Sequence, residues 1–478
     1  MKWDVRPLRC VMSHFLQRNG LTVQRSNIHS AILKIAIPSI LANITIPLVG
    51  LVDMIIAGHI SSAWAIGGIA VGTMLFDMLY GCFGFLRVST AGLTAQAYGA
   101  DNPDECGRLF VRSSALALAG AMLIWLLQIV YLEAVLAVMP CSQEVAEFAR
   151  TYYNIRIWAA PATLMIMTCK GWFIGMQDGV RAMVTDLVVN GVNMLASYLL
   201  AVHTSLGVAG VAYGTLIAQW TGLITALAMI AVRYRANFQL STFRLLSTLN
   251  FQHSTNNRFF RLNADLFVRS LCFIVVYVGW TVISSSYGDV ELAASALMMK
   301  LFMLFSFFID GFAFAGEALV GKAIGAQQST IDSKFSTRRL LSTFNSQLST
   351  IIRALFAWGT GVGLFFSLLY LLFPEALFSS LTTDREVVDT MHHYLGWLVA
   401  MPIVSMLAFM WDGIYVGATR GKEIRNAMLW AAFAFAVTYF LLSTINGQFS
   451  AIIGMHALYA AYFAHLGARV IYLTVKFK

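Results

Sequence analysis

The chain has 478 residues, of which 59% are apolar and only 12% are charged. Soluble domains carry about 25% charged residues, so this composition excludes a soluble globular protein. The formal net charge of +9 is compatible with nucleic-acid binding, but the basic residues are spread over alternate loops between apolar segments. That distribution indicates membrane topology, and no nucleic-acid partner is expected.

Twelve apolar segments run through the chain, and each is long enough to cross about 30 Å of hydrocarbon. The sequence therefore predicts an all-α polytopic membrane protein with two halves of six helices. The second segment of each half exceeds a simple span, so we expect it to tilt, bend or continue beyond the membrane. The predicted segments lie near 32–57, 65–97, 111–137, 149–175, 184–203, 207–233, 264–286, 290–323, 351–373, 388–418, 425–445 and 449–474.

Lysine and arginine are concentrated in one set of loops, which the positive-inside rule places in the cytoplasm together with both termini. The N-terminal segment lacks a long apolar core and is not expected to be a cleavable signal peptide. The predicted domains are a cytoplasmic segment (1–30), a first half (31–233), a cytoplasmic linker (234–263) and a second half (264–478).

Two internal repeats are present. Residues 63–100 align without a gap with residues 289–326, at an offset of 226 residues. Such a repeat is typical of secondary transporters that are built from two related bundles. A separate repeat relates residues 241–250 to residues 336–345. We interpret it as a tolerated insertion in cytoplasmic loops, and the sequence assigns it no role.

Asp53 is the most informative charge, because an ionisable residue within a span is costly and usually faces a cavity, a partner or an ion path. Pro38 and Pro47 precede it in the same span, and each removes a backbone donor and makes the helix bendable. Protonation would abolish the cost of burying the carboxylate, which favours a proton-operated helix. The alternative is that Asp53 caps the helix or pairs with His59.

The fifth predicted span carries a polar stripe. Asn190, Asn193 and Ser197 share one helix face, and Thr215 lies on the next span. Such a stripe either lines a hydrated pocket or joins neighbouring helices, and the sequence favours neither interpretation.

The second half carries four charged residues within or near its spans, namely Lys300, Asp310, Glu317 and Asp412. Three acids and one cation in hydrocarbon predict a polar network in which Lys300 pairs with one of the acids. Asp77 and Arg87 are expected to form a similar pair in the first half. Glu317 stands where the first copy of the repeat has Ala91, so the second copy has gained charge.

No enzyme signature is present: the chain has no P-loop, no HExxH, no Gly-x-Ser-x-Gly and no Cys/His set with metal spacing. We therefore expect no enzymatic activity, no cofactor and no metal site. The six cysteines show no paired spacing and are expected to be small buried residues. Without an ATPase motif, transport would depend on an ion gradient or a partner.

Several motifs resemble those of multidrug and toxic compound extrusion (MATE) transporters, and within them the DNA-damage-inducible F type. The resemblance covers roughly residues 30–475. It rests on five segments, namely 47–53 with Gly58-His59, 85–90 running into 92–97 with Gly99-Ala100, 173–177, 310–321 and 412–418.

The resemblance implies a V-shaped pair of six-helix lobes that exports substrate in exchange for inward H⁺ or Na⁺. It also implies that Asp53 is the essential acid and that the first span bends at Pro38. The family's polar residues of spans five and six correspond to Asn193 and Thr215. One departure is clear, because Ser197 stands where related transporters carry a second acid. This departure makes H⁺ the favoured coupling ion.

The predicted function is therefore a monomeric, cation-coupled antiporter in the plasma (inner) membrane that exports amphipathic organic compounds. Its other partners are membrane lipids. The first alternative is a lipid-linked oligosaccharide flippase of the same superfamily, which would need cations inside the spans to hold a pyrophosphate. The second alternative is a non-transporting membrane protein.

Overall fold

The computed structural model describes residues 25–60, 63–138, 142–235, 253–332, 338–445 and 451–477, which form helices joined by short turns. Twelve spans among them are long and apolar enough to cross a membrane, which confirms the predicted all-α polytopic class. The first bundle contains α2 (Arg25–Ile60), α3 (Ala63–Cys82), α4 (Phe85–Gly99), α5 (Pro103–Val138), α6 (Gln143–Arg156), the 3₁₀ turn η1 (Ile157–Ala159), α7 (Ala160–Gly175), α8 (Gly179–Val202) and α9 (Val208–Arg233). The second contains α11 (His253–Ser285), α12 (Asp289–Asp332), α13 (Arg338–Leu372), α14 (Pro374–Leu381), α15 (Arg385–His393), α16 (Leu395–Gly417), α17 (Gly421–Ile445) and α18 (Ala451–Lys476).

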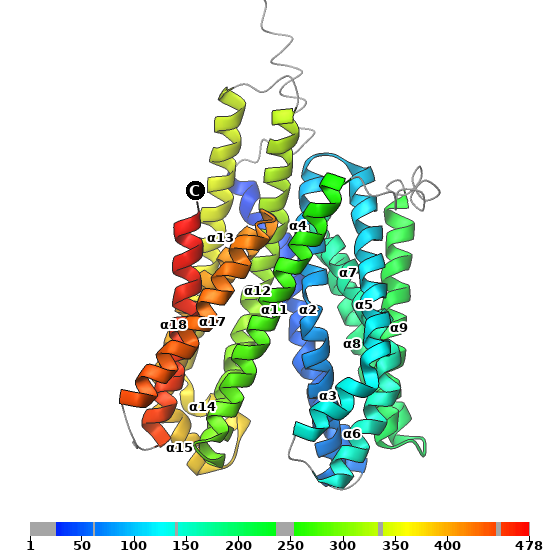
Figure 1. Ribbon diagram of the computed structural model, residues 1–478, viewed down its shortest axis with the longest axis vertical. Coiled ribbons are helices and arrows are strands. Elements are labelled where there is room, and N and C mark those ends of the chain that lie inside the picture. Colours follow the sequence, from blue (N-terminus) through cyan, green and yellow to red (C-terminus); the bar gives the residue numbers. More distant parts are fainter. Residues whose placement is uncertain are drawn as a thin grey trace, which may run out of the picture.

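The long second segment of each half behaves differently in the two bundles. In the first bundle it breaks next to Gly84 into α3 and α4, whereas α12 continues as one helix of 44 residues. A helix of that length extends for about 66 Å, which exceeds the hydrocarbon thickness. Accordingly, α12 and the beginning of α13 project beyond the other helices at one end (Figure 1).

Two predicted boundaries differ from the structure. α11 begins at His253, so the last part of the predicted linker 234–263 is helical, while residues 236–252 lie outside the described residues. The predicted segment 388–418 is two helices, because α15 ends at His393 and α16 begins at Leu395. The two copies of the short loop repeat lie wholly or partly outside the described residues.

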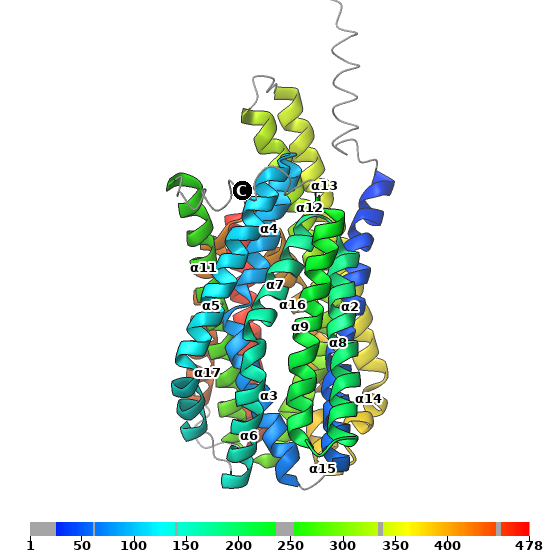
Figure 2. The ribbon, with the colours of Figure 1, turned by 90° about the vertical axis from the view of Figure 1, so that its right-hand side faces the viewer.

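The two bundles meet at one end of the molecule and diverge toward the other (Figures 1 and 2). We call the end that holds the C-termini of α4, α7 and α16 the convergent end. The opposite end, near α3, α6, α14 and α15, is the divergent end. Each bundle has its own core of large buried side chains, such as Trp172 in the first bundle and Phe305 in the second.

Glycine contacts show that the two bundles are related by an internal symmetry. A Cβ atom at Gly171 of α7 would lie 2.2 Å from the carbonyl oxygen of Arg87 in α4. A Cβ atom at Gly413 of α16 would lie 2.3 Å from the carbonyl oxygen of Ala313 in α12. Arg87 and Ala313 are separated by the offset of 226 residues that the sequence repeat predicts. The same relation holds one helical turn later, for Gly175 on Ala91 and Gly417 on Glu317.

The two copies of the repeat also contact each other directly. A Cβ atom at Gly99 of α4 would lie 2.0 Å from the carbonyl oxygen of Lys322, and one at Gly325 of α12 would lie 1.9 Å from that of Gln96. Each contact becomes the other when 226 residues are exchanged, as expected for a two-fold relation between α4 and α12. The absence of side chains here lets the two backbones approach closely.

Polar contacts add to this junction at the convergent end. The Gln96 side chain donates a hydrogen bond of 2.8 Å to the carbonyl oxygen of Gly417, and Gln177 donates one of 2.8 Å to that of Ala318. Arg258 of α11 donates to the side-chain oxygen of Gln96 at 2.8 Å. The two bundles are therefore joined by backbone contact and by hydrogen bonds at the same end.

Substituting Gly325 with alanine is expected to destabilise the junction, because the new methyl group overlaps the backbone of α4. Overpacking of this kind typically costs about 1–3 kcal/mol. The melting temperature of the purified protein in detergent should therefore fall. The matched control is Gly361→Ala in α13, where a Cβ atom would meet nothing within 4 Å. This control should be neutral or slightly stabilising, and equal melting temperatures for the two variants would contradict the close contact.

Candidate functional site

The polar stripe of α8 is bonded to α9. The Asn193 amide donates a hydrogen bond of 3.0 Å to the Thr215 hydroxyl, and the Ser197 hydroxyl donates one of 3.3 Å to the Asn193 oxygen. All three side chains are buried, and Ser197 is completely inaccessible. Their polar groups bond to one another, so the contacts favour the interpretation that this part of the stripe joins two helices.

Close packing explains why a serine stands at position 197. A Cβ atom at Gly214 of α9 would lie only 2.4 Å from the Ser197 hydroxyl oxygen. A carboxylate side chain has no room at this contact without separation of the two helices. The departure from the acid of related transporters is therefore matched by the packing of α8 on α9.

Helix α2 contacts both bundles. The Asn190 amide of α8 donates a hydrogen bond to the Thr45 hydroxyl, whereas the Asn43 amide donates one of 3.2 Å to the carbonyl oxygen of Phe307 in α12. Near the beginning of α2, the Trp358 indole of α13 donates to His29 at 3.1 Å. α2 therefore bridges the two halves of the molecule.

The predicted hinge and coupling residues lie on this bridging helix. α2 runs from Arg25 to Ile60 with Pro38 and Pro47 inside it. Asp53 belongs to the same helix, but its side chain lies outside the described residues, as does that of His59. The structure thus brings Asn190 close to the proline-containing part of α2, and the role of Asp53 stays a prediction.

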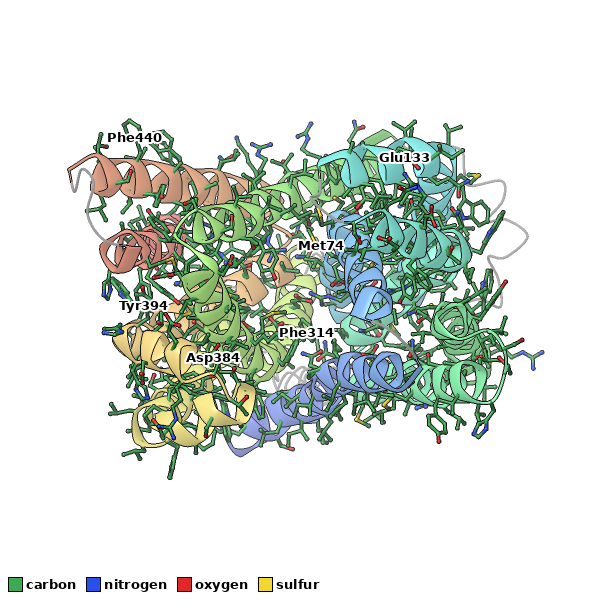
Figure 3. All side chains as sticks on the ribbon, turned by 90° about the horizontal axis from the view of Figure 1, so that it is seen from below. Met74, Glu133, Phe314, Asp384, Tyr394 and Phe440 are labelled. Carbon is green, nitrogen blue, oxygen red and sulfur yellow. The ribbon has the colours of Figure 1, made fainter. Side chains whose placement is uncertain are left out.

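An ion pair joins the two bundles between α4 and α12. The Arg87 guanidinium donates two hydrogen bonds to the Glu317 carboxylate, at 3.0 and 3.2 Å. The Glu317 side chain is 5% exposed and that of Arg87 is 19% exposed. The guanidinium also lies 4.1 Å from the centre of the Phe314 ring, which adds a cation–π contact. Seen from the divergent end, Phe314 and Met74 lie between the bundles (Figure 3).

This ion pair corrects two predictions. The expected pair between Asp77 and Arg87 is wrong, because Arg87 binds Glu317 and Asp77 lies exposed on α3. Lys300 is also exposed, and it forms no ion pair with an acid in the part of the chain that the structure describes. Both predictions paired residues that are close in sequence, whereas the real partners come from different bundles.

A second ionic group lies inside the second bundle. Asp412 of α16 accepts a hydrogen bond of 2.6 Å from Arg269 of α11 and bonds of 3.1 Å and shorter from Arg469 of α18. Arg469 is 2% exposed. Both guanidinium groups lie over the Phe273 ring, at 5.0 and 5.2 Å from its centre.

The sequence interpretation missed both of these arginines. Arg269 and Arg469 fall inside the predicted segments 264–286 and 449–474, so a complete count of charges within spans would have found them. The same holds for Lys170 of α7, which forms an ion pair of 2.8 Å with Asp186 of α8. The interpretation that the charges in the spans are mainly acidic is wrong, because arginine or lysine neutralises most of the buried acids.

Asp310 differs from the other acids of the second half. Its side chain is partly buried, and it forms no hydrogen bond or ion pair among the described residues. The charged groups that act on it are Arg87, Glu317, Arg269 and Asp412. With Arg469 this region holds three arginines and three acids, and Asp310 is the acid without a bonded partner. We refer to these six residues as the central ionic cluster.

The described residues contain no group of three histidines, cysteines, aspartates or glutamates that is placed to hold a metal ion. The chemistry available at the central ionic cluster is therefore exchange of protons and of ion-pair partners.

Comparisons with known proteins agree with this architecture. The model of the MatE family matches residues 38–199 and 266–340. DNA damage-inducible protein F of Escherichia coli (strain K12) is 34% identical over 442 residues, which cover 92% of this chain and 90% of that protein. Human multidrug and toxin extrusion protein 1 is 25% identical over 395 residues, which cover 82% of this chain and 65% of that protein.

Solved structures show the same fold. One is described as the outward-facing conformation of a multidrug resistance MATE family transporter; it aligns with a TM-score of 0.81 at 15% identity and covers 94% of this chain and 95% of that one. Another, a transporter from Pyrococcus furiosus described as having a binding pocket of reverse polarity, gives the same TM-score, identity and coverage. The fold and the matched relatives define a polytopic membrane transporter. The chain belongs to the MATE family and is similar to its DNA-damage-inducible F type.

Removing one partner of the Arg87–Glu317 pair should cost more stability than removing both. Breaking a buried ion pair typically costs about 3–5 kcal/mol, whereas replacing both partners by apolar residues is often nearly neutral. We expect Arg87→Met and Glu317→Met each to lower the melting temperature in detergent, and the double variant to recover most of the loss. Strictly additive losses would contradict a direct interaction between the two side chains.

Restoring an acid at position 197 should not create an ion site. Ser197→Asp is expected to separate α8 from α9 at an overpacking cost of about 1–3 kcal/mol, with a further loss from burying the charge. Ser197→Ala is the control, since it removes only one hydrogen bond, worth about 1 kcal/mol. Melting temperatures are compared in NaCl and in choline chloride. Stabilisation of the aspartate variant by Na⁺ would refute the interpretation of the stripe as a helix contact.

Proposed function

We propose that this protein is a cation-coupled antiporter that exports amphipathic organic compounds across the plasma membrane, with H⁺ as the favoured ion. The observation that carries the proposal is the buried Arg87–Glu317 pair between two related bundles in a chain of the MATE family. In transporters with repeated bundles, alternating access is largely a rocking of one bundle against the other. The printed names of the relatives, which refer to extrusion of drugs and toxins, support the substrate class.

The proposed orientation places the convergent end and both termini in the cytoplasm. Arginine-rich connections support this assignment, because the loop that follows α4 leads to Arg108 and Arg112, and the turn that follows α16 carries Arg420 and Lys422. In this orientation the bundles diverge toward the outside.

In the proposed mechanism Asp53 carries the proton and α2 transmits its effect. Protonation from the outside removes the cost of a buried charge and lets α2 bend or repack near Pro38 and Pro47. α2 is bonded to α8 through Thr45 and to α12 through Asn43, so movement of this helix acts on both bundles. The affinity for substrate falls when the proton binds, and substrate binding must lower the affinity for the proton in return.

H⁺ is favoured over Na⁺ because the first bundle lacks a second acid next to Asn193, where Ser197 packs against α9. A flippase for pyrophosphate-linked oligosaccharides is not favoured. Such a protein needs free cations in its spans, and here Arg87, Arg269 and Arg469 are all engaged by acids.

Transport by the purified protein in proteoliposomes tests this proposal. Under an imposed proton gradient the natural chain should concentrate ethidium, and Asp53→Asn should bind the dye but fail to concentrate it, with at least a tenfold loss of initial rate, about 1.4 kcal/mol. Glu133→Gln is the control, because Glu133 forms an exposed ion pair with Arg150.

Separate arms use a Na⁺ gradient and taurocholate, so that the coupling ion and the charge of the substrate are measured independently. An Asp53→Asn protein that still concentrates dye would remove Asp53 from the mechanism. A natural chain that moves no solute under either gradient would overturn the antiport proposal as a whole.

A further inference from the structure

Helix α12 presents two acids to the junction between the bundles, but only one of them is bonded. Glu317 holds Arg87 with two hydrogen bonds, whereas Asp310 has no bonded partner among the described residues. The two acids are seven residues apart, so they lie on one face of α12 and are separated by two turns, about 10 Å. Phe314 lies between them on this face and supports the Arg87 guanidinium.

Arg87 is the cation of the cluster that is free to change its partner. Arg269 and Arg469 are both bonded to Asp412, and Arg469 is almost inaccessible. Arg87 is 19% exposed and bonds only to Glu317, through a long and flexible side chain. It is also the first of the cations that act on Asp310, followed by Arg269.

The arrangement is not required by the fold. The residue that corresponds to Arg87 in the second copy of the repeat is Ala313, and the residues that correspond to Asp310 and Glu317 in the first copy are Gly84 and Ala91. The close glycine contacts are preserved in both copies, so packing alone does not demand these charges. One arginine facing two acids is a feature that this junction has in addition to the symmetric fold.

We propose that Asp310 is the second acceptor for Arg87, and that transport exchanges this arginine between Glu317 and Asp310. The inference rests on the antiport function proposed above. Rocking of the bundles moves α4 relative to α12 and breaks the Arg87–Glu317 bonds, which leaves two buried charges unpaired. Transfer of Arg87 along the Phe314 ring to Asp310 keeps the charge paired in the second state, in the manner of a stepwise shift between two packed elements. Asp310 is thus a positioning residue for transport.

The other charged groups around Asp310 fit this exchange. α11 contributes Arg269 and α16 contributes Asp412, and these two residues bond to each other at 2.6 Å. Because this pair is already satisfied, it compensates little for the charge of Asp310. α4 contributes Arg87, and α12 itself contributes Glu317.

The experiment measures transport and bundle separation in the same variants. Ethidium transport and binding are measured for the natural chain, Asp310→Asn, Asp310→Glu and the control Asp289→Asn, which removes the same charge from the exposed beginning of α12. Spin labels at Ile129 of α5 and Val282 of α11, which are 72% and 61% exposed, report the distance between the bundles. The labelled proteins use a background without native cysteines that still transports.

We expect two distance populations in the natural chain, with proportions that change when dye is added. Asp310→Asn should retain one population and lose about tenfold in turnover, as expected for loss of a hydrogen bond to a charged group, while dye binding stays within about twofold. Asp310→Glu should restore both populations and most of the turnover, and Asp289→Asn should match the natural chain. If Asp310→Asn transports within twofold of the natural chain, or keeps both populations unchanged, the exchange is refuted. If the natural chain moves no dye, the antiport proposal fails, and the distances still decide whether Asp310 holds the second state.

Discussion

The structure depends on one electrostatic contact, the paired hydrogen bonds between Arg87 of α4 and Glu317 of α12. The two residues belong to different bundles and meet where the backbones of α4 and α12 are close enough to exclude side chains. A buried charge in this position is tolerated only while it is paired. Any movement of one bundle against the other must therefore provide for these two charges, and this requirement connects the fold to its transport function.

The symmetric fold and the asymmetric charges have separate roles. The glycine contacts of α7 on α4 and of α16 on α12 repeat at fixed offsets, so the same close packing is used in both bundles. The charges do not repeat: Lys170 of α7 occupies the position that corresponds to Asp412 in α16, and each is neutralised by different neighbours. The symmetric contacts stabilise two similar bundles, and the differing charges distinguish what each bundle does.

Helix α2 gives the first half access to this junction. It bonds to α8 on one side and to α12 and α13 on the other, and it contains both prolines. A helix held in this way transmits a local change in its own geometry to both bundles. The ionic cluster and the proline-containing helix therefore approach α12 from two different sides, and α12 is the element through which the proposed proton site and the Arg87 junction communicate.

The sequence by itself determined the membrane class, the twelve spans and the repeat, because hydrophobic length and internal similarity are properties of the linear chain. It also identified Asn193, Thr215, Glu317 and Asp412 as polar residues with partners inside the membrane. Only the tertiary structure decided which partners they have. Arg87 and Glu317 are 230 residues apart, and Arg269 and Asp412 are 143 apart. Ion pairing depends on where helices cross, and the spacing of residues along one helix carries no information about such crossings.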